Sequence, residues 1–340
     1  MKNRRKLTLT IVGIILALCA LSGVGLLMYV SGTSGSLPEE GLRLNIPAGH
    51  AREVITSQLP ASYSGRVLMS LRLLGADTDA VHGSYVVSPD MAAWRLARRM
   101  QTHRQTPVRL TFTNLRTLGS VVSLVASRIE ADSAAVFAAM DSVLSARGFR
   151  GAAQYPAAFL PDTYEFYWTD SPARVISRMA DHRDAFWTPD RRRKAADLGL
   201  NPVKVATVAS IVEEETAKTD ERPAVARLYH NRIARGMKLQ ADPTVKFDLG
   251  DFGIRRLTIP LINRATGPYN TYRIAGLPPG PIRFVQSATL DAVLDAPRHD
   301  YLYMCARSDF SGYHAFATDA ATHAANARAY HRALNARNIH

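Results

Sequence analysis

The chain has 340 residues, of which 47% are hydrophobic and 21% are charged. This length allows two or three compact units, and the composition excludes a disordered or low-complexity chain. The formal net charge of +13 favours an anionic partner, such as nucleic acid, an acidic membrane surface or another anionic polymer.

The first element is an uncharged apolar run at residues 7–30, long enough to cross a bilayer as a helix. Four cations precede it, namely Lys2, Arg4, Arg5 and Lys6. The positive-inside tendency therefore predicts that residues 1–6 are a cytoplasmic tail and that the chain after residue 30 lies outside the cytoplasm. This location argues against nucleic acid. The alternative is a cleaved signal peptide, but the apolar run continues past the weak cleavage site near residue 22.

A flexible tether of small polar residues is expected at 31–39, followed by a small α+β module at 40–104. The module's predicted strands are 42–46 and 83–87, and its predicted helices are 51–59, 67–74 and 91–102. Residues 105–340 are expected to form a larger mixed α+β domain. Its predicted elements are strands at 108–112 and 301–304, helices at 118–128, 133–146, 171–198 (interrupted near residue 188) and 223–235, a helix beginning after Pro202, and a terminal helix at 318–338.

The two cysteines are separated by the predicted topology. Cys19 lies inside the apolar run and Cys305 near the end of the chain, so they are not expected to pair. The ten histidines show neither paired cysteine spacing nor an HExxH pattern, and the chain has no glycine-rich phosphate loop. The sequence therefore predicts no metal and no cofactor.

The strongest chemical signal is the octet ASIVEEET at residues 209–216, where three acids end an apolar helical run. On a helical projection Glu215 lies closest to the apolar face, Glu213 lies at its rim and Glu214 points into solvent. A carboxyl held against apolar surface has a raised pKa and can act as a general acid near neutral pH. The competing interpretation is a solvated, charged helix end.

Three blocks occur in a fixed order: the octet at 209–216, LQADPTV at 239–245, and YNTY at 269–272 followed by GLPPGPI at 276–282. In this order and spacing they resemble the endolytic murein transglycosylase family, also called MltG or YceG-like. Supporting pieces are LPDTYEF at 160–166, Asn231 with Arg232, and HAF at 314–316. The resemblance covers roughly residues 40–335.

The resemblance implies a single-pass inner-membrane protein with its catalytic domain on the periplasmic side and peptidoglycan glycan strands as its substrate. The family cleaves between N-acetylmuramic acid and N-acetylglucosamine and leaves 1,6-anhydro ends. It also implies a LysM-like module, here residues 40–104, and peptidoglycan synthases or other divisome or elongasome proteins as possible partners. Glu215 corresponds to the second glutamate of the family's Glu-x-Glu-Thr motif, the catalytic one.

The other blocks are expected to bind sugar hydroxyls, N-acetyl groups or ring faces. The candidate substrate-binding residues carry amides, carboxylates, hydroxyls or aromatic rings: Glu213, Gln240, Asp242, Thr244, Tyr269, Asn270 and Tyr272. Structural roles remain open for these residues and are favoured for Glu165 and His314. The segment 276–282 is expected to form a rigid wall of the cleft.

Two other functions remain open. One is a wall-binding or divisome scaffold in which catalysis is lost or secondary, and the other is a hydrolase in which Glu215 acts with Glu165 or Asp242 and a water. A lytic transglycosylase needs only one carboxyl group, whereas ordinary glycosidases use two. The products distinguish these enzymes, since hydrolysis leaves reducing ends.

Overall fold

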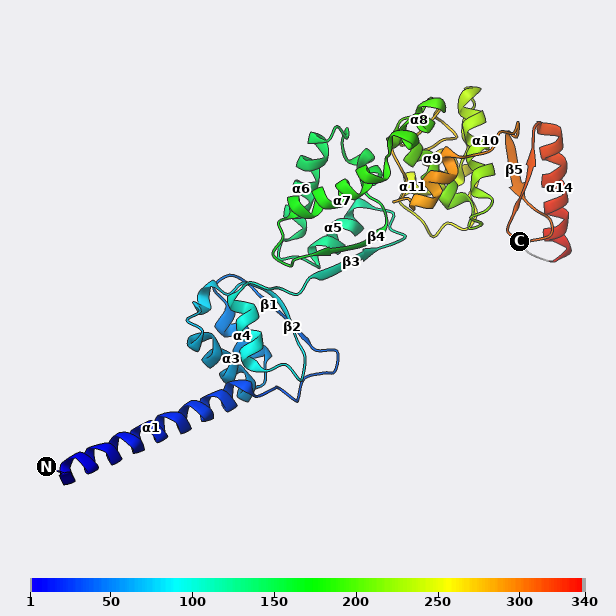
Figure 1. Ribbon diagram of the computed structural model, residues 1–340. Coiled ribbons are helices and arrows are strands. Elements are labelled where there is room, and N and C mark those ends of the chain that lie inside the picture. Colours follow the sequence, from blue (N-terminus) through cyan, green and yellow to red (C-terminus); the bar gives the residue numbers. More distant parts are fainter. Residues whose placement is uncertain (1, 338–340) are drawn as a thin grey trace. The chain divides into compact units, whose positions relative to one another are not determined.

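The computed structural model describes residues 2–337, which divide into two compact units of mixed α and β structure (Figure 1). The first unit holds the chain up to Arg109 together with residues 128–130 and 165–171. The second holds the remaining residues from Leu110 onward.

The first unit begins with the long helix α1 (Lys2–Ser31). Its segment Lys6–Ser31 is the one helix of the described chain that by itself is long and apolar enough to cross a membrane. The side chains of residues 6–29 are exposed to solvent in the structure. An apolar surface around a whole helix is typical of a segment that lipid surrounds.

A small α+β module follows α1. It contains β1 (Leu42–Ile46), α2 (Ala51–Gln58), α3 (Ala61–Leu73), β2 (Gly83–Val87) and α4 (Ala93–Gln101). The two strands pair antiparallel, with Leu42 opposite Val87 and Ile46 opposite Gly83. Both predicted strands are confirmed in their predicted bounds. The helix predicted at 67–74 begins six residues earlier, directly after Pro60, because proline is compatible with a helix start.

The module has its own hydrophobic core between the sheet and its helices. Tyr63 and Tyr85 are fully buried there, with Leu44, Ile55 and Leu96 around them. The hydroxyl of Tyr63 donates to the carbonyl of Met91 at 2.8 Å, which satisfies the polar end of a buried ring.

Residues 31–39, expected to be a flexible tether, instead contact the module. The amide of Gly35 donates to the carbonyl of Pro89 at 3.0 Å, and the amide of Ala93 donates to the carbonyl of Gly32 at 3.2 Å. The guanidinium of Arg66 also donates to the carbonyl of Thr33 at 3.4 Å. The flexibility of this tether stays a prediction, while these backbone contacts show that it lies against the module.

The second unit is predominantly helical. Its α-helices are α5 (Leu118–Ala126), α6 (Ser133–Ala146), α7 (Pro172–Phe186), α8 (Pro189–Asp197), α9 (Pro202–Glu215), α10 (Arg222–Ala234), α11 (Asp242–Leu249), α12 (Ile259–Arg264), α13 (Ser287–Leu294) and α14 (Ala320–Ala336). Its strands are β3 (Val108–Phe112), β4 (Asp162–Phe166), β5 (Tyr303–Ala306) and β6 (His314–Ala317). The first residues of β3 and the last residues of β4 are assigned to the first unit. The strand β3 pairs with β4. The interruption predicted near residue 188 is confirmed as the junction between α7 and α8.

Helix α9 forms the centre of this unit. Asn201 caps its N-terminus by accepting a hydrogen bond from the Lys204 amide at 2.9 Å. Every residue from Val205 to Glu213 is buried, and α9 packs against α10, α11 and α13. The sequence pattern predicted one apolar face, but neighbouring elements cover the helix on all sides. Its C-terminal acids therefore lie within protein rather than at a solvated helix end.

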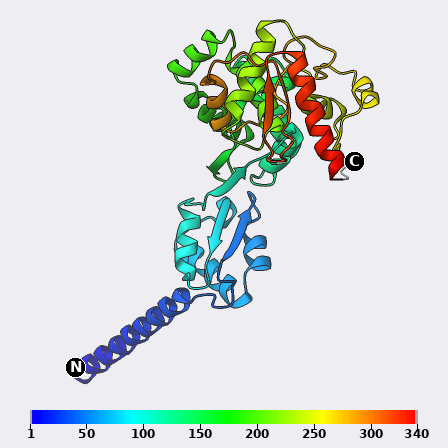
Figure 2. The same ribbon diagram turned by 90° about the vertical axis from the view of Figure 1, so that its right-hand side faces the viewer.

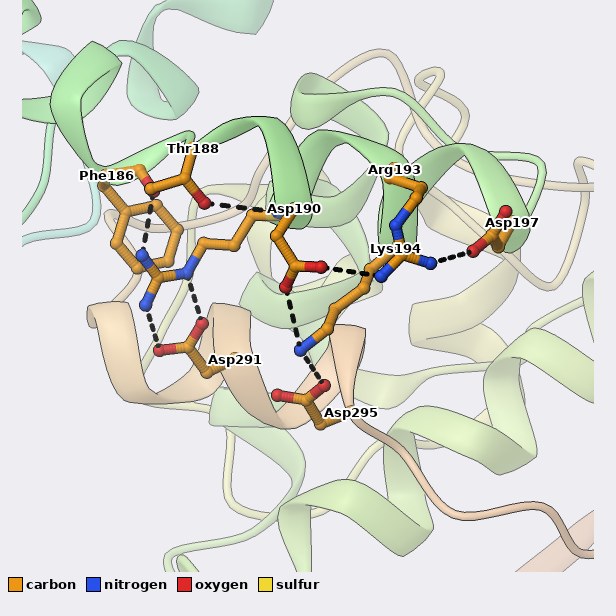
Figure 3. Close-up of polar contacts among 9 residues, drawn as sticks. Phe186, Thr188, Asp190, Arg193, Lys194, Asp197, Asp291 and Asp295 are labelled. Carbon is orange, nitrogen blue, oxygen red and sulfur yellow. Dashed lines mark hydrogen bonds and ion pairs between the residues drawn. The ribbon is translucent and has the colours of Figure 1, made fainter.

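Ion pairs join α8 to α13, the helix that packs on α9 (Figure 3). Arg191 forms two bonds to Asp291, at 2.7 and 3.0 Å, and Lys194 lies 2.6 Å from Asp295. Arg193 pairs within α8 and stays exposed. The bidentate pair has the geometry that fixes orientation best, whereas exposed single pairs contribute about 0–1 kcal/mol each.

A C-terminal hairpin completes the unit (Figure 2). Strand β5 pairs antiparallel with β6, with Tyr303 opposite Ala317 and Ala306 opposite His314. Helix α14 packs on both strands and is capped by Asp319, which accepts from the Thr322 amide at 2.8 Å. The strand predicted at 301–304 is thus shifted by two residues, while the terminal helix lies within its predicted bounds.

Candidate functional site

Glu215 is the last residue of α9, and its side chain faces an open pocket of about 350 Å³. Burial raises the pKa of the Glu215 carboxyl to about 7. A hydrogen bond from the Tyr229 hydroxyl, 2.7 Å from Oε1, opposes this shift, while the negative charge of Asp242 adds to it. The positive charges of His314 and Lys246 lower the pKa. The prediction of a semi-buried acid at Glu215 is confirmed.

The pocket gathers residues that lie far apart in the sequence. Helix α10 contributes Tyr229, the segment before α11 contributes Gln240, and the C-terminal hairpin contributes Cys305. Arg232 on α10 fixes the segment before α11 and the start of the hairpin, because its guanidinium donates to the carbonyls of Leu239 and Leu302, both at 2.6 Å. The neighbouring helix and the hairpin therefore position the surroundings of Glu215.

Three of the predicted substrate-binding residues line the pocket: Gln240, Asp242 and Tyr272. The Tyr272 hydroxyl donates to Oδ1 of Asp242 at 2.5 Å. Gln240 adopts a positive φ of 50°, an uncommon conformation for a side-chain-bearing residue. Its amide donates to the carbonyl of Thr271 at 3.2 Å, which ties the LQADPTV block to the YNTY block.

Two other predicted binders are buried and bonded within the protein. The Thr244 hydroxyl donates to the carbonyl of Ala241 at 2.6 Å, and Thr244 is 0% exposed. Asn270 is also 0% exposed and donates to the carbonyls of Ile262 and Ala265, at 2.8 and 2.7 Å. Neither lines the pocket, and the hydrogen bonds of both side chains link segments within the protein.

Tyr269 also lies off the pocket. Its ring centre is 4.6 Å from that of Phe247, and its amide donates to Oδ1 of Asp248 at 3.0 Å. These contacts pack the YNTY turn against α11. Tyr269 therefore supports the segment that carries Tyr272 rather than facing the space beside Glu215.

Glu213 was expected at the rim, in contact with substrate, but it is only 7% exposed. Its Oε2 accepts from the Thr289 hydroxyl at 2.6 Å and the Gln286 amide at 3.2 Å, and Oε1 lies 3.3 Å from Arg283. The rim placement is wrong, because α13 and the segment before it cover this side of α9.

Glu214 was expected in solvent, and this prediction is also wrong. Its side chain is 16% exposed and pairs with two arginines. Arg116 donates to both carboxylate oxygens, at 3.0 and 2.9 Å, and Arg283 donates to Oε1 at 2.7 Å. A helical projection considers one helix alone, whereas loops from residues 114–116 and 282–286 supply the arginines here.

Glu165 is exposed on β4, 3.8 Å from Arg109, and does not line the pocket. The segment 276–282 does not line it either. Gly276 to Pro279 lie on a separate hollow near the start of α9. Gly280 passes so close to the backbone of Ala153 that a Cβ would collide with its carbonyl oxygen. These contacts agree with the expected rigid segment. The expectation that it forms a wall of this pocket is wrong, because the pocket lining does not include it.

His314 does line the pocket, and its partner was not anticipated. Its Nδ1 lies 2.8 Å from Oε2 of Glu221, and its amide donates to Oε1 at 2.6 Å. Because a carboxylate only accepts hydrogen bonds, Nδ1 carries the proton. Glu221 is 6% exposed and precedes α10. The two residues are 93 positions apart, so local spacing gave no signal of this pair.

Within residues 2–337 no group of three or more His, Cys, Asp or Glu side chains is arranged to hold a metal ion. Cys19 and Cys305 are both free thiols. Cys305 lies on the pocket, and burial raises its pKa.

A sequence model described as the YceG-like family matches residues 44–329. The chain belongs to the YceG-like family. Relatives include a Bacillus subtilis protein named endolytic murein transglycosylase, 39% identical over 44% of this chain and 41% of that protein. A Streptococcus pneumoniae protein with the same name is 31% identical over 43% of this chain and 27% of its own length. The alignments thus span less than half the length of these curated relatives.

A solved structure agrees with the family assignment. The crystal structure of a yceG-like protein from Listeria monocytogenes superimposes with a TM-score of 0.56 and 25% sequence identity. The match covers 85% of this chain and 99% of that one. The mixed α+β architecture of this YceG-like chain therefore recurs in a solved relative.

Proposed function

We propose that this chain is a membrane-anchored endolytic lytic transglycosylase of peptidoglycan. It cleaves the bond between N-acetylmuramic acid and N-acetylglucosamine within a glycan strand and leaves a 1,6-anhydro-muramic end. The observation that carries the proposal is Glu215, a carboxyl whose pKa is raised to about 7 beside an open pocket. The relatives named endolytic murein transglycosylase support the substrate class.

In this mechanism Glu215 acts twice. Its protonated carboxyl donates a proton to the glycosidic oxygen as the bond to the anomeric carbon breaks. The resulting carboxylate takes the proton of the muramic C6 hydroxyl, whose oxygen bonds to the anomeric carbon. No water is consumed and the carboxyl is restored. A pKa near the working pH suits both steps, since the same group must give and accept a proton.

The pocket residues have separate proposed roles. Gln240 and Tyr272 offer an amide and a hydroxyl to the sugar. Tyr229 donates to the Glu215 carboxylate, which favours the ionised form reached halfway through the reaction. His314, oriented by Glu221, supplies a ring nitrogen on the hairpin side of the pocket.

We also propose that α1 anchors the protein in the inner membrane with residues 1–6 in the cytoplasm and the catalytic unit on the periplasmic side. The uncharged span and the cations before it support this orientation. The module at 40–104 is proposed to be LysM-like and to contact glycan, supported by its separate core and two-stranded sheet. Peptidoglycan synthases are proposed as neighbours, because the substrate is their product.

The decisive experiment incubates the full-length protein with uncrosslinked, lipid-linked glycan strands and analyses the products by mass spectrometry. A Glu215→Gln variant, checked for folding by circular dichroism, is the matched control. Anhydro-muramic ends formed only by the wild type are the expected result. Reducing ends would show a hydrolase instead. Strand binding without cleavage by either protein would favour a scaffold and overturn the proposal.

A further inference from the structure

Two carboxyl groups share the pocket, and each has its own tyrosine. Glu215 and Asp242 are the two acidic side chains among the described residues that line it. Tyr229 donates to Glu215 at 2.7 Å and Tyr272 donates to Asp242 at 2.5 Å. Burial raises the pKa of both phenols, so they remain hydrogen-bond donors at neutral pH.

One acid affects the proton of the other. Negative charge on Asp242 raises the pKa of Glu215, which favours the protonated form of the Glu215 carboxyl. The two tyrosine environments differ, because Tyr229 is 2% exposed whereas Tyr272 lies partly open on the pocket. Two acids with different protonation states in one site are typical of enzymes that cleave glycosidic bonds.

Two other charged groups near Glu215, Arg232 and His314, have partners of their own. Arg232 donates to the carbonyls of Leu302 and Leu239, and His314 pairs with Glu221. Lys246 acts on Glu215 from α11, and His323 lines the pocket from α14, where burial and Arg232 lower its pKa. Asp242 is thus the negative group of the pocket that is available to a positive charge on the substrate.

We propose that ionised Asp242 stabilises the positive charge that develops at the anomeric carbon as the glycosidic bond breaks, and that Tyr272 positions it. This inference rests on the proposed function. Asp242 forms no bond and moves no proton: the leaving oxygen receives its proton from Glu215, and the C6 oxygen bonds to the anomeric carbon. Glu215 then takes the hydroxyl proton, so atoms and charges balance.

The test measures kcat and KM of full-length Asp242→Asn and Tyr272→Phe on glycan strands. Loss of an electrostatic stabiliser typically costs about 10²–10³-fold in kcat, and Asp242→Asn is expected in this range with little change in KM. Tyr272→Phe keeps the carboxylate but loosens it, so a loss of about 10-fold is expected. Asp242→Glu restores the charge and is expected to recover part of the rate.

The pH profile separates catalysis from a structural role. Activity requires protonated Glu215 and therefore falls as pH rises through its pKa of about 7. Without the negative charge of Asp242, that pKa drops, so Asp242→Asn is expected to move the falling limb to lower pH. A structural defect would lower the amount of active enzyme and leave the limb in place.

The outcomes distinguish this inference from the proposed function. If Glu215→Gln retained cleavage, the proposed function itself would fail. If Glu215→Gln were inactive while Asp242→Asn kept a wild-type kcat and an unmoved limb, only the role of Asp242 would be overturned. Should Asp242→Asn be poorly folded, an unchanged kcat in folded Tyr272→Phe would equally contradict the positioning role.

A second, independent feature lies on the first unit. Between residues 32 and 109 the large apolar side chains that are exposed are Met69, Leu73 and Trp94, 38%, 53% and 37% exposed. Leu73 and Trp94 line an apolar hollow of about 340 Å³ together with Leu27 and Val30 of α1. The exposed apolar surface of the module is thus continuous with the last turn of the apolar helix.

We infer that this apolar face, defined by Met69, Leu73 and Trp94, lies in the lipid–water interface on the periplasmic side of the inner membrane. A lipid acyl chain fills the hollow. The inference rests on the proposed anchoring by α1. Hydrogen bonds from Gly35 and Ala93 hold the chain close to the module directly after the span. Tryptophan at the level of a span's last turn is typical of the membrane interface.

Spin-label accessibility tests this surface in full-length protein reconstituted into lipid nanodiscs. The label is placed by Leu73→Cys, or at the exposed control position on α2 by Ser57→Cys, after Cys19→Ala and Cys305→Ala. The Leu73 label is expected to be relaxed more by oxygen than by a water-soluble nickel chelate, and the Ser57 label the reverse. Equal, water-like accessibility at both positions would overturn the inference.

Discussion

Removing the hydroxyl of Tyr229 tests how the structure sets the protonation of Glu215. This hydroxyl donates to Oε1 at 2.7 Å and favours the ionised carboxyl. A hydrogen bond to a charged group contributes about 1.5 kcal/mol, which corresponds to about one pKa unit. Tyr229→Phe should therefore raise the pKa of Glu215 from about 7 to about 8.

The assay is the pH dependence of kcat/KM on glycan strands. Because the proposed mechanism requires protonated Glu215, the falling limb should move up by about one unit. Tyr155→Phe is the matched control, since the Tyr155 hydroxyl is buried and bonded to Asp141 at 2.5 Å, and Tyr155 does not line the pocket. A limb that stayed fixed or moved to lower pH in Tyr229→Phe would refute the reasoning.

Two stability predictions follow. Because the pKa of Glu215 is raised in the folded state, its contribution to stability is complete below about pH 4.5 and is lost as pH rises through about 7. Glu215→Gln avoids this loss, so its free energy of unfolding should exceed that of the wild type by up to about 3 kcal/mol at pH 8, with a higher Tm. At pH 4 the two Tm values should match. A Tm difference independent of pH would contradict this. Arg283→Met removes the cation that lies 3.3 Å from the buried carboxylate of Glu213 and one of the two arginines bound to Glu214, at a cost of about 3–5 kcal/mol. The exposed Arg193→Met control should change stability by less than about 1 kcal/mol, and equal Tm losses would show that burial is not the cause.

Local patterns were sufficient for the elements that depend on the chain alone. The uncharged run at 7–30 predicted a spanning helix, and alternation predicted strands at 42–46 and 83–87 in the bounds that the structure shows. The periodicity of α9 also identified Glu215 as the acid nearest the apolar face. These signals are readable because side-chain direction within one helix or strand follows from its own geometry.

The environments of Glu213 and Glu214 could not be predicted from local sequence patterns. Their burial depends on Arg283 and Arg116, which approach α9 from segments about 70 and 100 residues away. Thr244 carries the same hydrogen-bonding groups as a sugar-binding residue, yet the fold turns it into a buried link between two blocks. Residue type gives chemical capacity, whereas exposure to the pocket is decided by packing.

The sequence by itself thus determined the long apolar helix, the strands of the small α+β module and the position of Glu215 at the end of a helix. Only the tertiary structure decided which groups surround that acid: Tyr229 from α10, Asp242 from the first turn of α11 and His314 from the hairpin. The physical reason is that desolvation and charge act through space over a few ångströms, irrespective of separation along the chain. The pKa of Glu215 is therefore a property of the folded unit rather than of its motif.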